Sequence, residues 1–184
     1  RHLHNGRRRQ RQMCIRDSPE NAKKLIDTGV TGIAYETVTS SDGSMPLLAP
    51  MSTIAGQLAF VVGSYHLLKH NKGKGVMIGH MDDMDPRVVT VIGAGVAGTQ
   101  SILKAIDNKA LVKVVDSSQS KLDDLKSKYG TENVEYILSS KDSIQVSVNE
   151  SDLVIGSVYV VGKEAPKVVT KDMLSSMNPG TVMV

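Results

Sequence analysis

Three glycines with a fixed spacing are the residues of this sequence best suited to hold a phosphate group. Gly93, Gly95 and Gly98 form the pattern G-x-G-x-x-G, directly after an apolar run and at the expected start of a helix. In that setting the first glycine permits a tight turn, the second lets the backbone approach a pyrophosphate, and the third lets the helix pack closely on the strand. The free N–H groups at the helix start favour the phosphate charge. The pattern predicts a dinucleotide-binding site.

An acidic residue at the end of the following strand fits the same chemistry. Asp116 lies 18 residues after Gly98. A carboxylate at this place can accept hydrogen bonds from an adenosine ribose, and it would repel a 2′-phosphate. The only basic residue soon after it is Lys121. The sequence therefore predicts NAD rather than NADP as the cofactor, and the alternative is a purely structural glycine turn followed by an ordinary strand-end aspartate.

A regular alternation of apolar strands and helices after Arg87 would position these residues. Helices are expected over 95–107 and 118–128, and strands over 88–92, 111–115, 134–138, 153–155 and 181–184. Strands that alternate with helices form a parallel sheet with helices on both faces. We predict an α/β fold in which residues 87–184 form a Rossmann-type, doubly wound parallel sheet that stops within its last strand.

The chain before residue 87 has a different organisation. A short helix is expected over 19–29, a buried strand over Gly32–Val38 and a long helix over 51–69. Apolar residues recur in the long helix at spacings of three and four, as in an amphipathic helix; they are Met51, Ile54, Ala55, Leu58, Val62 and Tyr65. We assign 19–69 to part of a second domain with a long connecting helix, and 70–86 to a connector.

The net charge of +3 belongs to the N-terminal residues. Six of the 22 basic residues and one of the 19 acidic residues lie within 1–18, so the remainder carries a net charge of −2. We interpret 1–18 as an unstructured or non-native leader; nucleic-acid binding and targeting are the alternatives. One cysteine excludes an internal disulfide, and no apolar run is long enough to span a bilayer. We expect a cytoplasmic protein with no bound metal, no membrane partner and no nucleic-acid partner.

Longer segments are more specific than the glycine motif. They are Ala34–Val38, Asp42–Ser44 and Pro46–Ser52, and the match continues through 152–156, 165–167 and 177–180. Together they resemble the alanine dehydrogenase/transhydrogenase NAD-binding family over about residues 19–184. The resemblance implies an NAD-dependent oxidoreductase that converts L-alanine to pyruvate and ammonia as a homo-oligomer. It makes 19–69 part of the substrate domain and the chain a fragment.

The resemblance also implies roles on the adenosine side of the cofactor. The backbones of Val96 and Ala97 would meet the pyrophosphate. Asp116 would bind the ribose, Lys121 would lie near the adenosine, and Ser139 would lie beside the adenine.

On the nicotinamide side, the resemblance implies contacts from two further residues. Ser52 would face the nicotinamide, and its alternative or additional role is a helix N-cap. Val158 would lie under the nicotinamide ribose, with core packing as its alternative role. The family's substrate-binding Arg and Lys, its acid–base His and a further Asp match no residue here, so no catalytic residue is assigned.

Three functions remain open from the sequence. The family resemblance favours a fragment of an alanine dehydrogenase, in which Met51, Ile54, Leu58 and Val62 would contribute to subunit contacts unless they pack on their own domain. The NAD-binding part of a proton-translocating transhydrogenase is the first alternative. A non-enzymatic NAD-sensing module is the second, because a fold alone does not fix a function.

Overall fold

The chain divides after Tyr35 into two compact units, residues 1–35 and 36–184. The computed structural model describes residues 18–79, 82–160 and 165–184. Unit 1 contains helix α2 (Pro19–Asp27), which confirms the short helix expected there. Its start is set by Pro19 in the first turn and by the Ser18 side chain, which accepts a hydrogen bond from the Asn21 N–H. The expected leader lies outside the described residues, apart from Ser18.

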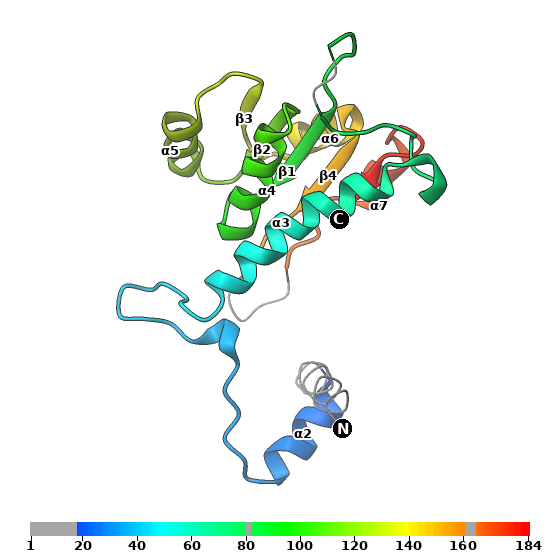
Figure 1. The fold of residues 1–184 in the computed structure, drawn as a ribbon. Helices are drawn as coiled ribbons and strands as arrows, with labels where there is room; N and C mark the ends of the chain where they lie inside the picture. Colours follow the sequence, from blue (N-terminus) through cyan, green and yellow to red (C-terminus); the bar gives the residue numbers. More distant parts are fainter. Residues whose placement is uncertain (1–17, 80–81, 161–164) are drawn as a thin grey trace, which may run out of the picture. The chain divides into compact units, whose positions relative to one another are not determined.

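Five parallel strands in the described part of the chain form one sheet in the order β3-β2-β1-β4-β5 (Figure 1). The strands are β1 (Val88–Ile92), β2 (Leu111–Asp116), β3 (Val134–Leu138), β4 (Leu153–Gly156) and β5 (Val182–Met183). The sheet grows from β1 through β2 to β3 on one side and from β4 to β5 on the other. The expected Rossmann-type sheet is therefore confirmed, and its chain order reverses between β1 and β4, where ligands bind in such folds.

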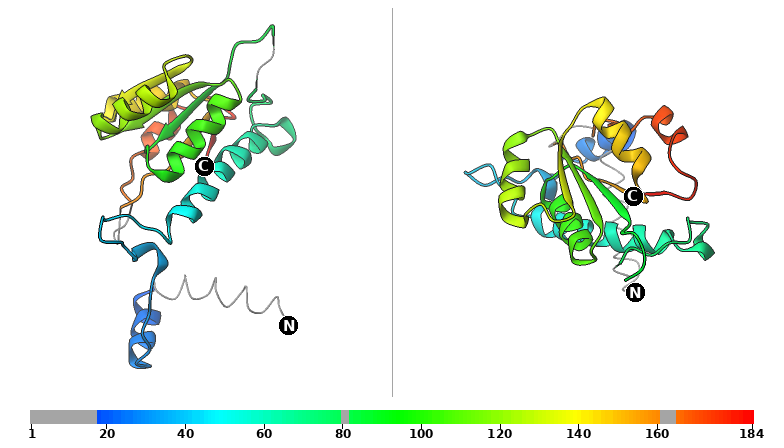
Figure 2. Two further views of the ribbon diagram at one scale, coloured as in Figure 1. Left: turned by 60° about the vertical axis from the view of Figure 1, so that its left-hand side comes forward. Right: turned by 90° about the horizontal axis from the view of Figure 1, so that it is seen from above.

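Helices cover both faces of this sheet (Figure 2). The described helices of unit 2 are α3 (Ala49–His66), α4 (Val96–Asp107), α5 (Gln119–Tyr129), α6 (Lys141–Glu150) and α7 (Lys171–Ser175), with short 3-10 turns η1 (Tyr35–Thr37) and η2 (Lys69–Asn71). One apolar cluster joins α3, α4 and α5 to the sheet through Phe60, Ile102 and Leu122. A second cluster on the other face joins α6 and α7 through Val148 and Met173.

Sequence periodicity did not predict α6 and α7. Both helices start with reciprocal capping interactions, Ser140 with Ser143 and Thr170 with Met173. The apolar residues of α6 alternate with polar ones, which is not a helical period, and α7 is too short to show a period, so hydrophobic periodicity predicted neither helix.

Helix α3 packs on α4 through its small residues. A Cβ on Gly56 would lie 2.0 Å from the carbonyl oxygen of Ala97, so the two helix backbones nearly touch. The Ser101 hydroxyl donates to the Gly56 carbonyl oxygen at 2.7 Å, and Phe60 is buried one turn further along α3.

The opposite side of α3 is an exposed apolar face. Its members are Met51, Ile54, Leu58, Val61, Val62 and Tyr65, each between 43% and 61% exposed. Unit 2 therefore does not cover Met51, Ile54, Leu58 and Val62, and both the predicted subunit contact and its alternative, packing on their own domain, stay predictions.

The strand expected over Gly32–Val38 is also wrong. Tyr35–Thr37 form a 3-10 turn, and no described residue of 32–38 pairs with the sheet. A strand needs partners for its backbone N–H and C=O groups, and an apolar, β-branched run does not supply them by itself.

Candidate cofactor-binding site

The glycine turn lies between the end of β1 and the start of α4. Gly93 has φ +100°, a left-handed conformation that favours glycine. Its N–H donates to the Val115 carbonyl oxygen at 2.8 Å, which anchors the turn to β2. A Cβ on Gly93 would lie 2.9 Å from the Ser157 carbonyl group and 3.0 Å from the Val158 nitrogen. The loop that follows β4 therefore leaves no room for a side chain at position 93.

The other two glycines have opposite surroundings. A Cβ on Gly98 would lie 1.8 Å from the Gly93 carbonyl oxygen, so Gly98 lets α4 close onto the turn. A Cβ on Gly95 would have no neighbour within 4 Å among the described residues. Gly95 is exposed, and the space beside it is open to a ligand that needs close contact with the backbone.

The start of α4 presents backbone donors at this opening. Gly95 is its N-cap residue, and no described side chain caps the helix, whereas Ser118, Ser140 and Thr170 cap α5, α6 and α7. The first N–H groups of a helix have no partner within the helix, and they attract negative charge. The N–H groups of Val96 and Ala97 are therefore placed to bind an anion.

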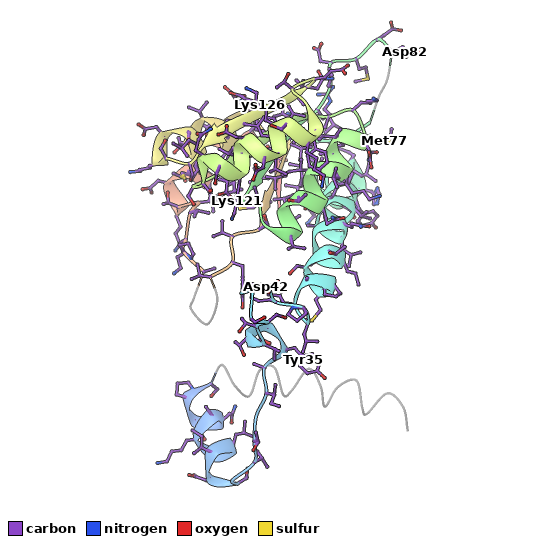
Figure 3. All side chains as sticks on the ribbon, turned by 90° about the vertical axis from the view of Figure 1, so that its left-hand side faces the viewer. Tyr35, Asp42, Met77, Asp82, Lys121 and Lys126 are labelled. Carbon is purple, nitrogen blue, oxygen red and sulfur yellow. The ribbon has the colours of Figure 1, made fainter. Side chains whose placement is uncertain are left out.

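An open hollow of about 430 Å³ lies between α4 and α5 beside the turn. Its lining residues are Ala94, Gly95, Val96, Thr99, Gln100, Lys121, Asp124 and Leu125. Lys121 lies in the first turn of α5, nearer its start than Lys126 (Figure 3). Lys121 is exposed and lines the hollow together with Gly95 and Val96, so it adds a positive charge there.

Asp116 is 8% exposed, and its carboxylate holds the glycine turn to the end of β2. Its Oδ2 accepts the Ala94 N–H at 2.7 Å, and its Oδ1 accepts the Ser118 N–H at 2.9 Å. A carboxylate has about four acceptor positions, so both oxygens keep capacity for ribose hydroxyls. The hydrogen bond to Ala94 could not be predicted from the sequence, because strand and turn meet only in the fold.

The remaining site residues expected from the sequence lie around the same edge of the sheet. Ser139 follows β3, and its N–H donates to the Asp116 carbonyl oxygen at 2.9 Å. Val158 is partly buried against the apolar cluster of α6 and α7, as its packing alternative requires. Ser52 is not an N-cap: the N-cap residue of α3 is Leu48, whose carbonyl oxygen accepts the Ser52 N–H at 2.9 Å. Ser52 lies one turn before Gly56 on α3.

Ser157 is a residue of this site that the sequence did not indicate. Its hydroxyl donates to the Gly93 carbonyl oxygen at 2.6 Å and lies 3.1 Å from the Ile92 carbonyl oxygen. A single serine after a strand carries no pattern, so only the structure brings it to the glycine turn.

The described residues contain neither a candidate metal site nor a candidate membrane-spanning helix. No group of three His, Cys, Asp or Glu side chains there could hold a metal ion. None of the helices described combines the length and the apolar character needed to cross a membrane.

The sheet order, the glycine turn and the strand-end acid define a Rossmann-type nucleotide-binding fold. The chain belongs to the alanine dehydrogenase/PNT family, whose C-terminal domain model matches residues 59–184. This confirms the resemblance seen in the sequence.

Curated relatives and solved structures agree with this family. The chain is 44% identical to the alanine dehydrogenase of Halomonas elongata over 162 residues, which are 88% of this chain and 43% of that protein. It is 44% identical to the Mycobacterium tuberculosis alanine dehydrogenase over 161 residues, with shares of 87% and 43%. An L-alanine dehydrogenase structure matches with a TM-score of 0.83 and 36% identity, over 92% of this chain and 46% of that one. The chain thus spans a little less than half the length of these relatives.

A transhydrogenase structure from Sinorhizobium meliloti is a more distant match. Its TM-score is 0.63 at 24% identity, over 74% of this chain and 40% of that chain. That level of identity shows a shared fold alone.

Proposed function

We propose that this chain is the cofactor-binding part of an NAD-dependent L-alanine dehydrogenase, which oxidises L-alanine to pyruvate and ammonia. The observation that carries the proposal is the uncapped start of α4 beside Gly95, with Asp116 tied to the same turn. The relatives named alanine dehydrogenase support the reaction.

Different residues of the chain bind different parts of the cofactor. The N–H groups of Val96 and Ala97 bind the pyrophosphate, Gly95 leaves room for it, and Lys121 adds positive charge at the rim. Asp116 accepts from the adenosine ribose, and Ser139 lies beside the adenine. Ser52 and Val158 face the nicotinamide end of the cofactor.

The bound cofactor supplies the chemistry, by accepting a hydride from the substrate. The chain's own contribution is to fix the position of the dinucleotide at the reversal between β1 and β4, where the nicotinamide can meet a substrate.

NAD is proposed over NADP because of Asp116. Its side chain is nearly buried, and both oxygens are held by backbone N–H groups. A carboxylate that cannot turn away would repel a 2′-phosphate on the ribose.

The whole enzyme is proposed to be a homo-oligomer. The exposed apolar face of α3 is large for a surface helix, and contiguous apolar surface of this kind is typical of protein contacts.

Calorimetric titration of the 184-residue chain with NADH and NADPH tests the function and the role of Asp116 together. The wild-type chain should bind NADH more tightly than NADPH. Asp116→Ala should weaken NADH binding by about 1–3 kcal/mol, the scale of hydrogen bonds to a charged group. NADPH binding should fall less or rise.

Asp123→Ala is the matched control, because it removes the same charge from the exposed surface of α5, outside the lining of the hollow and away from the turn. It should change NADH affinity by less than about 0.5 kcal/mol. Tighter wild-type binding of NADPH would contradict the role of Asp116, and no binding of either nucleotide would contradict the function.

A further inference from the structure

Ser157 lies where the two halves of the sheet meet. In the register of β1 and β4, Ile92 lies opposite Gly156, so Gly93 and Ser157 are the residues that directly follow these two adjacent strands. The Ser157 N–H donates to the Ile92 carbonyl oxygen at 2.8 Å, and its hydroxyl donates to the Gly93 carbonyl oxygen at 2.6 Å. One residue thus extends the strand pairing into the glycine turn.

The space around Ser157 is shared by two of the three glycines. A Cβ on Gly93 would lie 2.9 Å from the Ser157 carbonyl group, and a Cβ on Gly98 would lie 2.6 Å from the Ser157 Oγ. The hydroxyl therefore fills the gap that Gly98 leaves, against the carbonyl of Gly93. The position of the hydroxyl is fixed by its packing against Gly98 as well as by its hydrogen bond to Gly93.

We propose that Ser157 is a positioning residue that locks the glycine turn to the loop after β4, so that the pyrophosphate and the nicotinamide ribose of one cofactor are held in register. The proposal rests on the proposed function. Val158 is the next residue along the chain, and the Ser157 hydroxyl is bound to Gly93, two residues before the N-cap residue of α4. Ser157 itself touches neither the adenosine side of the site nor, in this role, the reacting atoms.

This placement predicts a split between two probes. NADH needs both the turn and the loop after β4, whereas adenosine 5′-monophosphate needs the turn and the ends of β2 and β3. Ser157→Ala removes one neutral hydrogen bond, so NADH affinity should fall about three- to tenfold. Affinity for the monophosphate should change by less than about twofold, because the turn itself is still held by the Val115 carbonyl and by Asp116, and only its register with the loop after β4 is lost. Ser157→Cys, whose thiol is a weaker donor, should fall between wild type and Ser157→Ala for NADH.

Ser151→Ala is the matched control at the other end of β4. Ser151 is fully buried, and its hydroxyl lies 2.6 Å from both the Ser147 carbonyl oxygen and the Thr90 hydroxyl. Its loss should lower the melting temperature and leave NADH affinity within about twofold of wild type, because the change is remote from the turn. A structural role for Ser157 would predict the same pattern for Ser157→Ala.

The measurements are calorimetric affinities of the 184-residue chain for NADH and adenosine 5′-monophosphate, with circular dichroism to check folding. A selective loss for NADH in Ser157→Ala, and an intermediate loss in Ser157→Cys, support the proposal. Unchanged NADH affinity overturns it, and so does an equal loss for both probes. Should Ser157→Ala lose its native spectrum, Ser157→Cys decides by the same criterion. Failure of the wild-type chain to bind NADH overturns the proposed function first, and this inference with it.

Discussion

Gly95 and Gly98 belong to the same turn, yet a side chain would have different consequences at each. Gly95→Ala should leave folding unchanged, because its Cβ would meet nothing within 4 Å among the described residues and its φ of −77° suits any residue. The new methyl group would occupy the space beside the helix start. NADH affinity should therefore fall by at least about tenfold, or 1.4 kcal/mol.

Gly98→Ala should instead lower the free energy of unfolding, since its Cβ would meet the Gly93 carbonyl oxygen at 1.8 Å. Overpacking of this kind costs about 1–3 kcal/mol or more. Urea unfolding and NADH titration of both variants separate the two effects. The assignment of Gly95 to the ligand would be wrong if Gly95→Ala bound NADH as tightly as wild type.

Lys113 gives the sheet a pH dependence at alkaline pH. It lies beside Glu135 in the register of β2 and β3, with Nζ 3.3 Å from Glu135 Oε2, and it also pairs with Glu150. Burial lowers the pKa of Lys113, but the hydrogen bonds and charges of Glu150 and Glu135 outweigh burial and raise it above its ordinary value of 10.5. The folded state then holds the proton more tightly than the unfolded state. This stabilisation is complete below pH 10.5 and is lost as the pH rises through the raised pKa.

The effect should be below about 1 kcal/mol, because both carboxylates are more than half exposed to solvent. The pKa of Tyr136 is also raised, by burial and by Tyr129, and it gives a loss of the same sign. The measurement is therefore made in a Tyr136→Phe background, as urea unfolding from about pH 9 to 12. Lys113→Met should flatten the alkaline decline, and an unchanged slope would show that the ion pairs do not act in solution.

At the scale of elements, the contact between α3 and α4 depends on the absence of one side chain. Gly56→Ala would drive a Cβ into the backbone of Ala97, and this should destabilise the fold by about 1–3 kcal/mol. Alanine is otherwise the better helix former by about 1 kcal/mol, so a simple helix would be stabilised by the same change. The sign of the change in urea unfolding therefore tests the contact.

Leu58→Ala on the exposed face of α3 is the control for that measurement. Leu58 is 53% exposed, and its truncation should change stability by less than about 0.5 kcal/mol. A Gly56→Ala protein as stable as this control would mean that the helices are further apart than the structure shows.

The strands of the sheet could be predicted from sequence, and the faces of α3 could not. Val88–Ile92 and Leu111–Asp116 are short, mostly apolar runs rich in valine and bounded by turns, which is the pattern of a buried strand in a parallel sheet. Helix α3 is apolar around most of its circumference, so periodicity does not tell which side packs. Gly56 and Gly63 decide it: a Cβ on Gly63 would lie 2.4 Å from Leu153. Glycine has no side chain to bury, so close packing at these two positions does not appear in the hydrophobic pattern of the sequence.

The candidate site shows the same division. The glycine turn and Asp116 could be predicted because their spacing reflects one local strand–turn–helix unit. Ser157 lies 64 residues from Gly93 in the sequence, and its contact with the turn exists because β1 and β4 are adjacent in the sheet. Contacts that cross the sheet require its strand order, which no short motif contains.

For the whole molecule, cofactor binding and catalysis are expected to separate. The 184-residue chain should bind NADH but show no alanine-dependent reduction of NAD. A positioned acid–base group contributes about 10²–10⁴-fold in rate, and no described histidine lies near the glycine turn. His66 and His70 instead lie beside Tyr65 at the far end of α3, with ring centroids 5.5 Å away.

Fluorescence first checks that the purified chain binds NADH. L-Alanine and NAD are then added, and the formation of NADH is followed by its absorbance. Preparations from an empty vector are the control. Alanine-dependent formation of NADH above that control would show that the 184-residue chain includes the missing acid–base group.

Three contacts hold the glycine turn in place. Asp116 at the end of β2 and Ser157 after β4 are hydrogen-bonded to it, and Gly56 on α3 packs against Ala97. These contacts are all made within the chain, so the turn has its shape before a ligand binds. Little conformational entropy is then lost when the pyrophosphate arrives, and no ordering step slows the encounter. Substitutions at Asp116, Ser157 or Gly56 that loosen the turn should consequently slow the arrival of the cofactor as well as shorten its residence time.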